Sequence, residues 1–183
     1  KAYNLISTSK VRNEMIIDDV ITCVARKQTP VILTRFKEHA KFLHDALKEK
    51  ADHVFLLYGD NSDKENTEIR VKLKQIPENE SLILVATGQK IGEGFDFPRL
   101  DVLMLAAPVS FEGRLEQYVG RLNRDYVGKE AVYVYDYIDS HVRYFDKMYA
   151  KRLRTYRKMG FSIWTQELQP KQIINAIFDS VNY

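Results

Sequence analysis

Hydrophobic and polar positions follow two different periods along most of the chain. Short apolar runs are typical of strands buried on both faces, and apolar residues recurring every three or four positions are typical of helices. Because the two kinds of segment alternate, we expect parallel crossovers in an α/β sheet flanked by helices. The predicted strands are 31–34, 53–58, 82–87, 101–106 and 131–137, and the predicted helices are 10–27, a segment built on Ala40, Leu43 and Leu47, 64–75 and 114–122.

The loops after these strands are the first places to look for a ligand, because open α/β sheets bind ligands at the carboxyl ends of their strands. Gly59, Thr87 and the segment after Ala107 occupy such loops. Beyond Asp139 the alternation stops. We therefore predict one α/β domain over residues 1–139 and a helical extension over 140–183 packed on it.

The extension begins with a predicted helix over 141–159, followed by Trp164, Pro170 and a second helix through Phe178. One side of the first helix is apolar and is expected to dock on the domain. Another side is basic, which fits a nucleic-acid backbone, a solvated face, or an acidic patch on a further domain. The apolar seam comprises Val142, Phe145, Tyr149, Leu153 and Tyr156, and the basic row comprises Arg143, Lys147, Lys151, Arg154 and Lys158.

Composition narrows the class of protein. The 183 residues are 45% hydrophobic, enough to bury the core of one domain, and the net charge of +3 excludes a globally basic surface. The single cysteine, Cys23, lies at an apolar helix position, so we expect a buried thiol in a cytoplasmic, reducing compartment. No apolar run approaches a membrane span of ~20 residues, and the first residues lack the apolar centre of a signal peptide. Because the chain starts at Lys1, we expect the natural protein to be longer.

The segment QYVGRLNR carries the sharpest chemical signal. Gln117, Gly120, Arg121 and Arg124 are spaced to share one face of a helix whose other side is apolar. Two guanidinium groups beside a glycine can hold several phosphate oxygens and neutralise charge that develops as a phosphoryl group departs. The arginines alone fit a solvated face equally well.

A second segment, VATGQKIGEGFDFP, leads from a strand end into a turn. Its three glycines within seven residues indicate positive φ angles or close approach of the backbone to another group. An ordinary turn between elements gives the same composition, and the alternative role for Asp96 is a turn-capping carboxylate. The order of residues is more specific than their composition.

Both segments resemble motifs of superfamily 2 helicases, DEAD/DEAH-type, most nearly those related to restriction and conflict-system translocases. QYVGRLNR resembles motif VI, the glycine-rich segment resembles motif V, and Thr34-Arg35-Phe36 resembles motif IV. The resemblance extends over 31–139 and implies a RecA-like, P-loop NTPase-like helicase C-terminal domain. Two positions depart from the usual pattern: Tyr118 stands where many members carry arginine, and Asn123 where many carry glycine.

The resemblance also implies roles for individual residues. Arg121 and Arg124 would reach the γ-phosphate of ATP bound with Mg²⁺ mainly by an N-terminal RecA-like domain, with Arg124 as the arginine finger and Gln117 orienting near the phosphates. Gly94, Asp96 and Gly120 would line the nucleotide. Nucleic-acid phosphates, of DNA rather than RNA, would be contacted by Thr34, Arg35, Thr87, Gly88, Gln89 and Lys90.

Other catalytic patterns are absent from the sequence. There is no Gly-x-x-x-x-Gly-Lys-Ser/Thr loop and no Asp-Glu pair at a strand end to hold magnesium, so we expect this chain alone to be inactive as an ATPase. Its four histidines lack metal-ligand spacing, and no metal site is predicted. The hypotheses are the ATP-hydrolysing half of a helicase or translocase and, alternatively, a non-catalytic module binding nucleic acid or protein.

Overall fold

The sheet of the protein is built from five parallel strands in the order β2-β3-β1-β4-β5. The computed structural model describes residues 2–92, 96–108 and 112–166. Every residue of the three central strands is buried, as their unbroken apolar runs predict, whereas the edge strands are partly exposed. The central strands are β1 (Pro30–Thr34), β3 (Leu82–Thr87) and β4 (Val102–Leu105), and the edge strands are β2 (His53–Leu57) and β5 (Tyr133–Asp136). The predicted parallel α/β sheet is confirmed.

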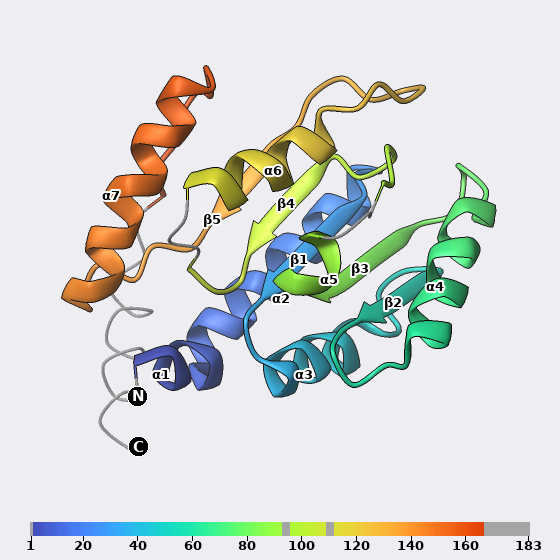
Figure 1. Ribbon diagram of the computed structural model, residues 1–183, viewed down its shortest axis with the longest axis horizontal. Helices are drawn as coiled ribbons and strands as arrows, with labels where there is room; N and C mark the ends of the chain where they lie inside the picture. The colour runs from blue at the N-terminus through green and yellow to red at the C-terminus, as the bar shows by residue number, and fades with distance from the viewer. Residues whose placement is uncertain (1, 93–95, 109–111, 167–183) are drawn as a thin grey trace.

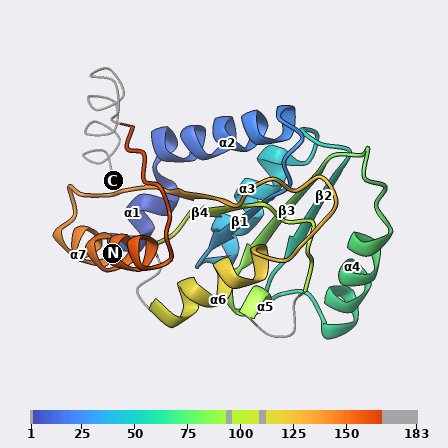
Figure 2. The same cartoon turned by 90° about the horizontal axis from the view of Figure 1, so that it is seen from above.

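Helices cover both faces of the sheet, which Figures 1 and 2 show from two directions. On one face lie α2 (Lys10–Ala25) and α3 (Lys37–Leu47), and on the other lie α4 (Asp63–Gln75), α5 (Gly88–Gly92) and α6 (Glu112–Leu122). The four helices predicted for this region are confirmed. The short α5 occupies part of the glycine-rich segment, where the sequence predicts only a turn.

Alternation along each strand divides the core into two layers. In β1, Val31 and Leu33 join the cluster beneath α4, α5 and α6, whereas Ile32 joins the cluster beneath α2 and α3. The same two-sided burial applies to β3 and β4, because side chains of a strand point to opposite faces in turn. Cys23 lies fully buried in the second cluster, as predicted.

A third apolar cluster joins the two ends of the described chain. The first helix, α1 (Ala2–Thr8), packs on α7 (Arg143–Lys158) through Ile6, Phe145 and Met148, and the Tyr3 and Phe145 rings meet edge to face at 4.9 Å. The sequence does not predict α1, because seven residues are too few for a helix to be stable without tertiary contacts. The predicted helix through Phe178 lies outside the described residues.

The buried side of α7 differs from the predicted apolar seam. Phe145 and Tyr156 are buried as expected, but Met148, Arg152 and Thr155 are buried as well. The remaining predicted seam positions are only half-buried: Val142, Tyr149 and Leu153. Val142 still packs against the cluster of Ile6, Phe145 and Met148. The predicted seam is therefore confirmed in part, and α7 also docks around an arginine that the prediction left out.

That arginine binds a carboxylate at the end of β5. Arg152 donates to both oxygens of Asp136, at 2.7 and 2.9 Å, and the Tyr156 hydroxyl donates to the same carboxylate at 2.7 Å. The side chain of Arg152 is 3% exposed. Because a planar guanidinium can satisfy both carboxylate oxygens at once, this group is buried without losing its partners.

A second buried ion pair ties α2 to the segment after β5. The Nε of Arg12 lies 3.0 Å from the Asp139 carboxylate, and Nη1 donates to the Ala106 carbonyl, just beyond β4. Ser9 caps the start of α2, and its hydroxyl accepts a hydrogen bond from the Arg12 amide.

Within the described ranges, none of the helices has the length and apolarity needed to cross a lipid bilayer.

Candidate functional site

Helix α6 has one buried and one exposed face, as the spacing of QYVGRLNR predicts. Gln117 and Gly120 are exposed and Arg121 is half-buried. A Cβ added at Gly120 would meet nothing within 4 Å, so this position is open to approach from outside the domain. The opposite face is buried against the sheet by Leu115, Tyr118, Val119 and Leu122.

Arg124 does not lie on the helix, which corrects the prediction that it shares the face of Gln117. Helix α6 ends at Leu122, and the Asn123 amide closes its last turn by donating to the Val119 carbonyl at 3.0 Å. The Arg124 side chain then leaves the following bend toward the glycine-rich segment. Its Nε lies 3.8 Å from Oδ1 of Asp96, and the two side chains are 62% and 58% exposed.

A lysine fixes the bend that carries Arg124. Nζ of Lys129 donates to the carbonyls of Arg124, at 3.0 Å, and Pro98, at 2.9 Å, and to that of Leu122. Removal from water lowers the pKa of Lys129. Sequence reasoning missed this residue, because its partners come from two segments and no local periodicity marks it.

The Arg124–Asp96 pair lies at the end of the sheet where the parallel strands begin, which we call the amino edge. The opposite end, where the strands finish, is the carboxyl edge. Pro98 lies four residues before β4 and Lys129 four residues before β5, so their contact marks the end of the sheet where these strands begin. The expectation that the important loops lie at the carboxyl ends is therefore incomplete. It fits Thr87, the last residue of β3, but α6 runs back across the sheet and delivers Arg124 to the opposite edge.

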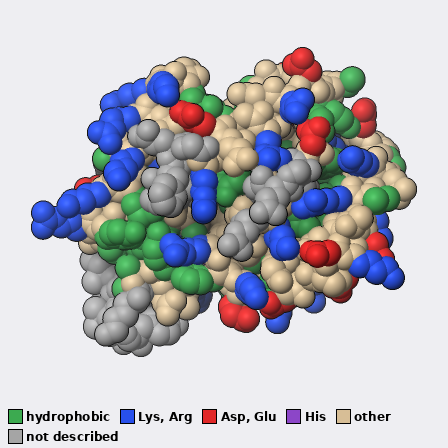
Figure 3. Space-filling model, in the orientation of Figure 1, with side chains coloured by type: hydrophobic (Ala, Val, Ile, Leu, Met, Phe, Trp, Pro, Cys, Tyr) green, Lys and Arg blue, Asp and Glu red, His purple; other side chains and the backbone are tan. Residues whose placement is uncertain are grey.

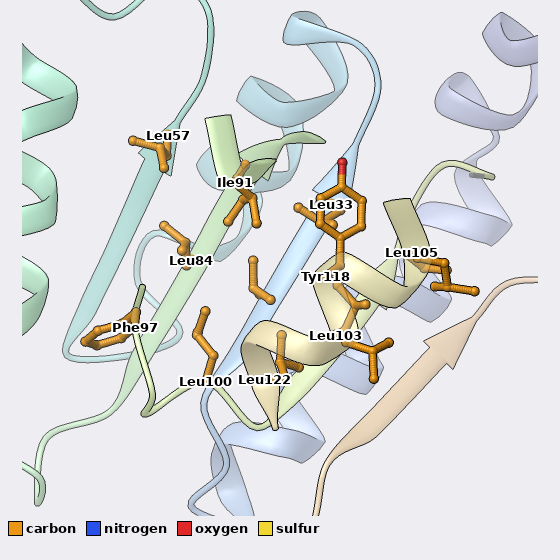
Figure 4. Packing of buried hydrophobic residues seen from close by; sticks show 14 of the residues in the cluster. Leu33, Leu57, Leu84, Ile91, Phe97, Leu100, Leu103, Leu105, Tyr118 and Leu122 are labelled. Atoms are coloured by element: carbon orange, nitrogen blue, oxygen red, sulfur yellow. The ribbon is translucent and has the colours of Figure 1, made fainter. Parts of the chain in front are cut away.

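Helix α6 contacts the carboxyl edge through Tyr118. The Tyr118 hydroxyl donates to the Gly88 carbonyl at 3.0 Å, and a Cβ at position 88 would lie only 2.8 Å from that hydroxyl oxygen. Figure 4 shows the Tyr118 ring in the apolar cluster with its oxygen directed away from Leu103 and Leu122. Burial raises the pKa of Tyr118. A side chain at position 88 would thus displace the Tyr118 hydroxyl, and α5 and α6 are joined at this point.

The remaining predicted contact residues are distributed around the same carboxyl edge. Thr34 and Thr87 are neighbours in the β1–β3 register, and both side chains are buried. Arg35 is exposed and stacks over the Tyr3 ring at 4.6 Å. Lys90 is half-buried, and its carbonyl accepts from Nη2 of Arg70 at 3.3 Å. Of the other predicted residues, Gly94 and the side chain of Gln89 lie outside the described part of the chain.

A family model described as the helicase conserved C-terminal domain matches residues 12–125. The chain belongs to this family. The matched segment contains Thr34, Thr87, Asp96 and both arginines, Arg121 and Arg124, so all the described positions of the site lie inside the helicase domain.

Comparison with individual proteins agrees with this family. The helicase domain is 32% identical over 120 residues to transcript termination protein A18 of Yaba-like disease virus, a match covering 64% of this chain and 24% of that protein. The chain thus spans about a quarter of the length of this curated relative.

Solved structures show the same fold. T4 UvsW aligns with a TM-score of 0.68 and 23% identity, over 86% of this chain and 34% of that one. The Mss116p DEAD-box helicase domain 2, solved bound to an RNA duplex, aligns with a TM-score of 0.61 and 18% identity, over 98% and 66% of the two chains. The predicted RecA-like fold of superfamily 2 helicase C-terminal domains is confirmed.

In this helicase domain Thr34 belongs to a buried hydrogen-bonded chain. Its hydroxyl lies 2.7 Å from Nδ1 of His39, Nε2 of His39 lies 2.8 Å from Oδ1 of Asn13, and the Asn13 amide donates to the Ser7 carbonyl at 2.9 Å. These hydrogen bonds link the end of β1 to α3, α2 and α1. The Thr34 hydroxyl is therefore engaged inside the domain rather than presented on its surface.

We expect the buried His39 in this hydrogen-bonded series to make the stability of the helicase domain sensitive to mild acid. Burial, with a further contribution from the charge of Arg12, lowers the pKa of His39 to about 4. An unfolded histidine titrates near pH 6.5, so between pH 6.5 and 4 the unfolded state binds a proton that the folded state does not, and stability falls with the pH. Chemical denaturation should show His39 contributing a loss of about 2 to 3 kcal/mol between pH 7.5 and 4.5.

The matched reference is His39→Gln, whose amide offers a donor and an acceptor but does not titrate in this range. The difference in unfolding free energy between the wild type and this variant should change by that amount over the same pH interval. An equal pH dependence in the two proteins would show that His39 is not held neutral.

Proposed function

We propose that this helicase domain is the C-terminal motor half of an ATP-dependent superfamily 2 helicase or translocase that acts on nucleic acid, with DNA as its track. Arg121 and Arg124 reach the γ-phosphate of ATP held by an N-terminal RecA-like domain. Gln117 orients near the phosphates, and Asp96 and the open backbone at Gly120 border the nucleotide. The track is contacted at the other edge of the sheet, at Thr87 and Gly88.

The observation that carries this proposal is the exposed pair of Arg124 and Asp96. Two side chains that are 62% and 58% exposed, with 3.8 Å between their charged atoms, form an ion pair worth less than about 1 kcal/mol. The pair therefore costs little to open. The Lys129 hydrogen bonds fix the backbone at Arg124, while the exposed Arg124 guanidinium is available to exchange a carboxylate for a phosphate.

The position of the two site segments supports a coupled motor. Gly88 lies at the carboxyl edge of the sheet, whereas Asp96 and Arg124 lie at the amino edge. Tyr118 fastens α6 to Gly88, and Lys129 fastens the end of α6 to Pro98. Movement of the arginines on a nucleotide is thereby transmitted to the backbone that contacts the track.

The described residues fit one end of a nucleotide and not the whole of it. Two guanidinium groups suit the anionic γ-phosphate, because they neutralise charge that grows as the phosphoryl group departs. The sequence contains neither the glycine-rich cradle for the other phosphates nor an Asp-Glu pair for magnesium. These parts, and the Mg²⁺ ion that they bind, belong to the N-terminal domain in this proposal.

ATP hydrolysis by the complete protein tests the proposal. We expect the complete protein to hydrolyse ATP, faster when DNA is added, and the 183-residue chain alone to release no phosphate above a buffer blank, since it holds only the arginine side of the site. Phosphate release by the two proteins at equal concentration makes the comparison. A complete protein without ATPase activity on DNA or RNA would instead indicate a non-catalytic binding module.

A further inference from the structure

Helix α7 exposes a line of positive charge that the ATP site does not use. Seven of its sixteen residues are Lys or Arg, against one acidic residue, Asp146. Arg152 is buried on Asp136, and the other six are exposed. At about 100° per residue, five of them fall within an arc of about 80°. These five form what we call the α7 basic row: Arg143, Lys147, Lys151, Arg154 and Lys158.

The row is held straight and in a fixed position. The ends of the row lie about 22 Å apart along the helix axis, at about 1.5 Å per residue. The bidentate Arg152–Asp136 pair and the Tyr156 hydroxyl fasten the helix to β5, and Phe145 and Met148 fasten its first turns to α1. Figure 3 shows Lys and Arg side chains gathered on the side of the molecule where α7 lies.

The charges of the row are largely unneutralised within the domain. Among the residues that the structure describes, Lys158 has an acidic partner, Glu116 at 3.3 Å, and no ion pair involves the other four members. Four like charges without acidic partners, aligned along one helix, repel one another. Binding of an extended polyanion would replace this repulsion with attraction and would release the counterions of the polyanion.

The row begins beside a residue already expected to contact the track. The Arg35 guanidinium lies 4.6 Å from the centre of the Tyr3 ring, and that ring lies 6.3 Å from the ring of Tyr144. Tyr144 directly follows Arg143, the first member of the row. Two tyrosine rings therefore connect Arg35, at the carboxyl edge of the sheet, to the first turn of the α7 basic row.

We propose that the α7 basic row binds the sugar-phosphate backbone of a DNA duplex and so extends the DNA-binding surface beyond the sheet. A rigid, straight line of cations matches a stiff polyanion. Single strands are usually gripped by aromatic side chains that stack on bases, and along this helix Tyr144 is exposed whereas Tyr149 is half-buried and Tyr156 buried. The inference rests on the proposed function in one respect: it takes the ligand to be the track of the motor.

Binding of a fluorescent DNA duplex of about 20 base pairs to the 183-residue chain tests this inference, without ATP and between about 50 and 200 mM salt. The variant carries Lys147→Gln, Lys151→Gln and Arg154→Gln. The matched control removes three exposed lysines from α4, which packs near the opposite edge strand: Lys64→Gln, Lys72→Gln and Lys74→Gln. Both variants lose the same net charge.

We expect the α7 variant to bind the duplex at least about tenfold more weakly than the control at low salt. The slope of log affinity against log salt should fall by about 2 to 3, since each duplex phosphate contact contributes about 0.9. The control should stay within about threefold of the wild type, and all three proteins should unfold at similar temperatures because the substituted side chains are exposed.

Three outcomes would overturn the inference: equal losses in the two variants, wild-type binding of a single strand of equal length as tight as that of the duplex, or competition by polyglutamate as effective as competition by unlabelled duplex. The last would assign the row to an acidic protein surface. Because no nucleotide is present, these results are independent of the arginines of the ATP site. Whether an Arg121 or Arg124 variant keeps or loses ATP hydrolysis therefore does not affect the conclusion on duplex binding by α7.

Discussion

Replacing Arg124 with alanine in the complete protein should lower kcat for DNA-stimulated ATP hydrolysis by about a thousandfold or more. An arginine that neutralises charge on the departing phosphoryl group contributes about 10³–10⁵ in kcat. Arg124 is exposed, and among the described residues its side chain forms an ion pair with Asp96 alone, so its loss should leave the fold intact. Steady-state phosphate release, with unfolding temperature measured alongside, makes this test.

Arg26→Ala is the matched control. Arg26 is an exposed arginine just after α2, on the other face of the sheet, and its removal changes the net charge by the same amount. We expect its kcat to stay within about twofold of the wild type. An Arg124→Ala protein that folds normally and retains more than a tenth of the wild-type kcat would remove Arg124 from the catalytic assignment.

The largest loss of stability is expected from Asp136→Ala. This substitution leaves the Arg152 guanidinium, which is 3% exposed, without its carboxylate and removes the acceptor of the Tyr156 hydroxyl. Breaking a buried ion pair from one side costs about 3–5 kcal/mol, because the remaining charge stays out of water. Urea unfolding of the 183-residue chain should show a decrease of this size.

Two further variants isolate the cause. Asp18→Ala removes an exposed carboxylate from α2 and should change the free energy of unfolding by less than about 0.5 kcal/mol. Combining Asp136→Ala with Arg152→Met should cost less than the two single substitutions added together, since no buried charge is left unpaired. Additive losses would mean that the pair does not hold α7 on the domain.

Much of this architecture could be predicted from local patterns. The central strands are unbroken apolar runs because both faces of β1, β3 and β4 are covered, and the helices between them show regular apolar spacing. The same spacing correctly separated the exposed Gln117 and Gly120 from the buried Tyr118. Patterns of this kind are local, and burial on one or both faces determines them directly.

The features that could not be predicted depend on partners far away in the sequence. Spacing alone placed Arg124 on the helix, but the Lys129 contacts fix a bend after Leu122 instead. From sequence, a basic residue in a basic helix is expected to be exposed to solvent. Arg152 is buried instead, because it pairs with Asp136, the last residue of β5. The location of Asp96 and Arg124 at the amino edge likewise follows from the path of α6 across the sheet.

The complete protein bound to ADP and aluminium fluoride, which imitates a phosphoryl group in transit, offers the most direct test of the motor assignment. A structure of that complex should show the Arg124 guanidinium released from Asp96 and within hydrogen-bond distance of a fluoride, with Arg121 beside it. Guanidinium groups that still face Asp96 or solvent, with the fluoride contacted only by the other domain, would contradict the account.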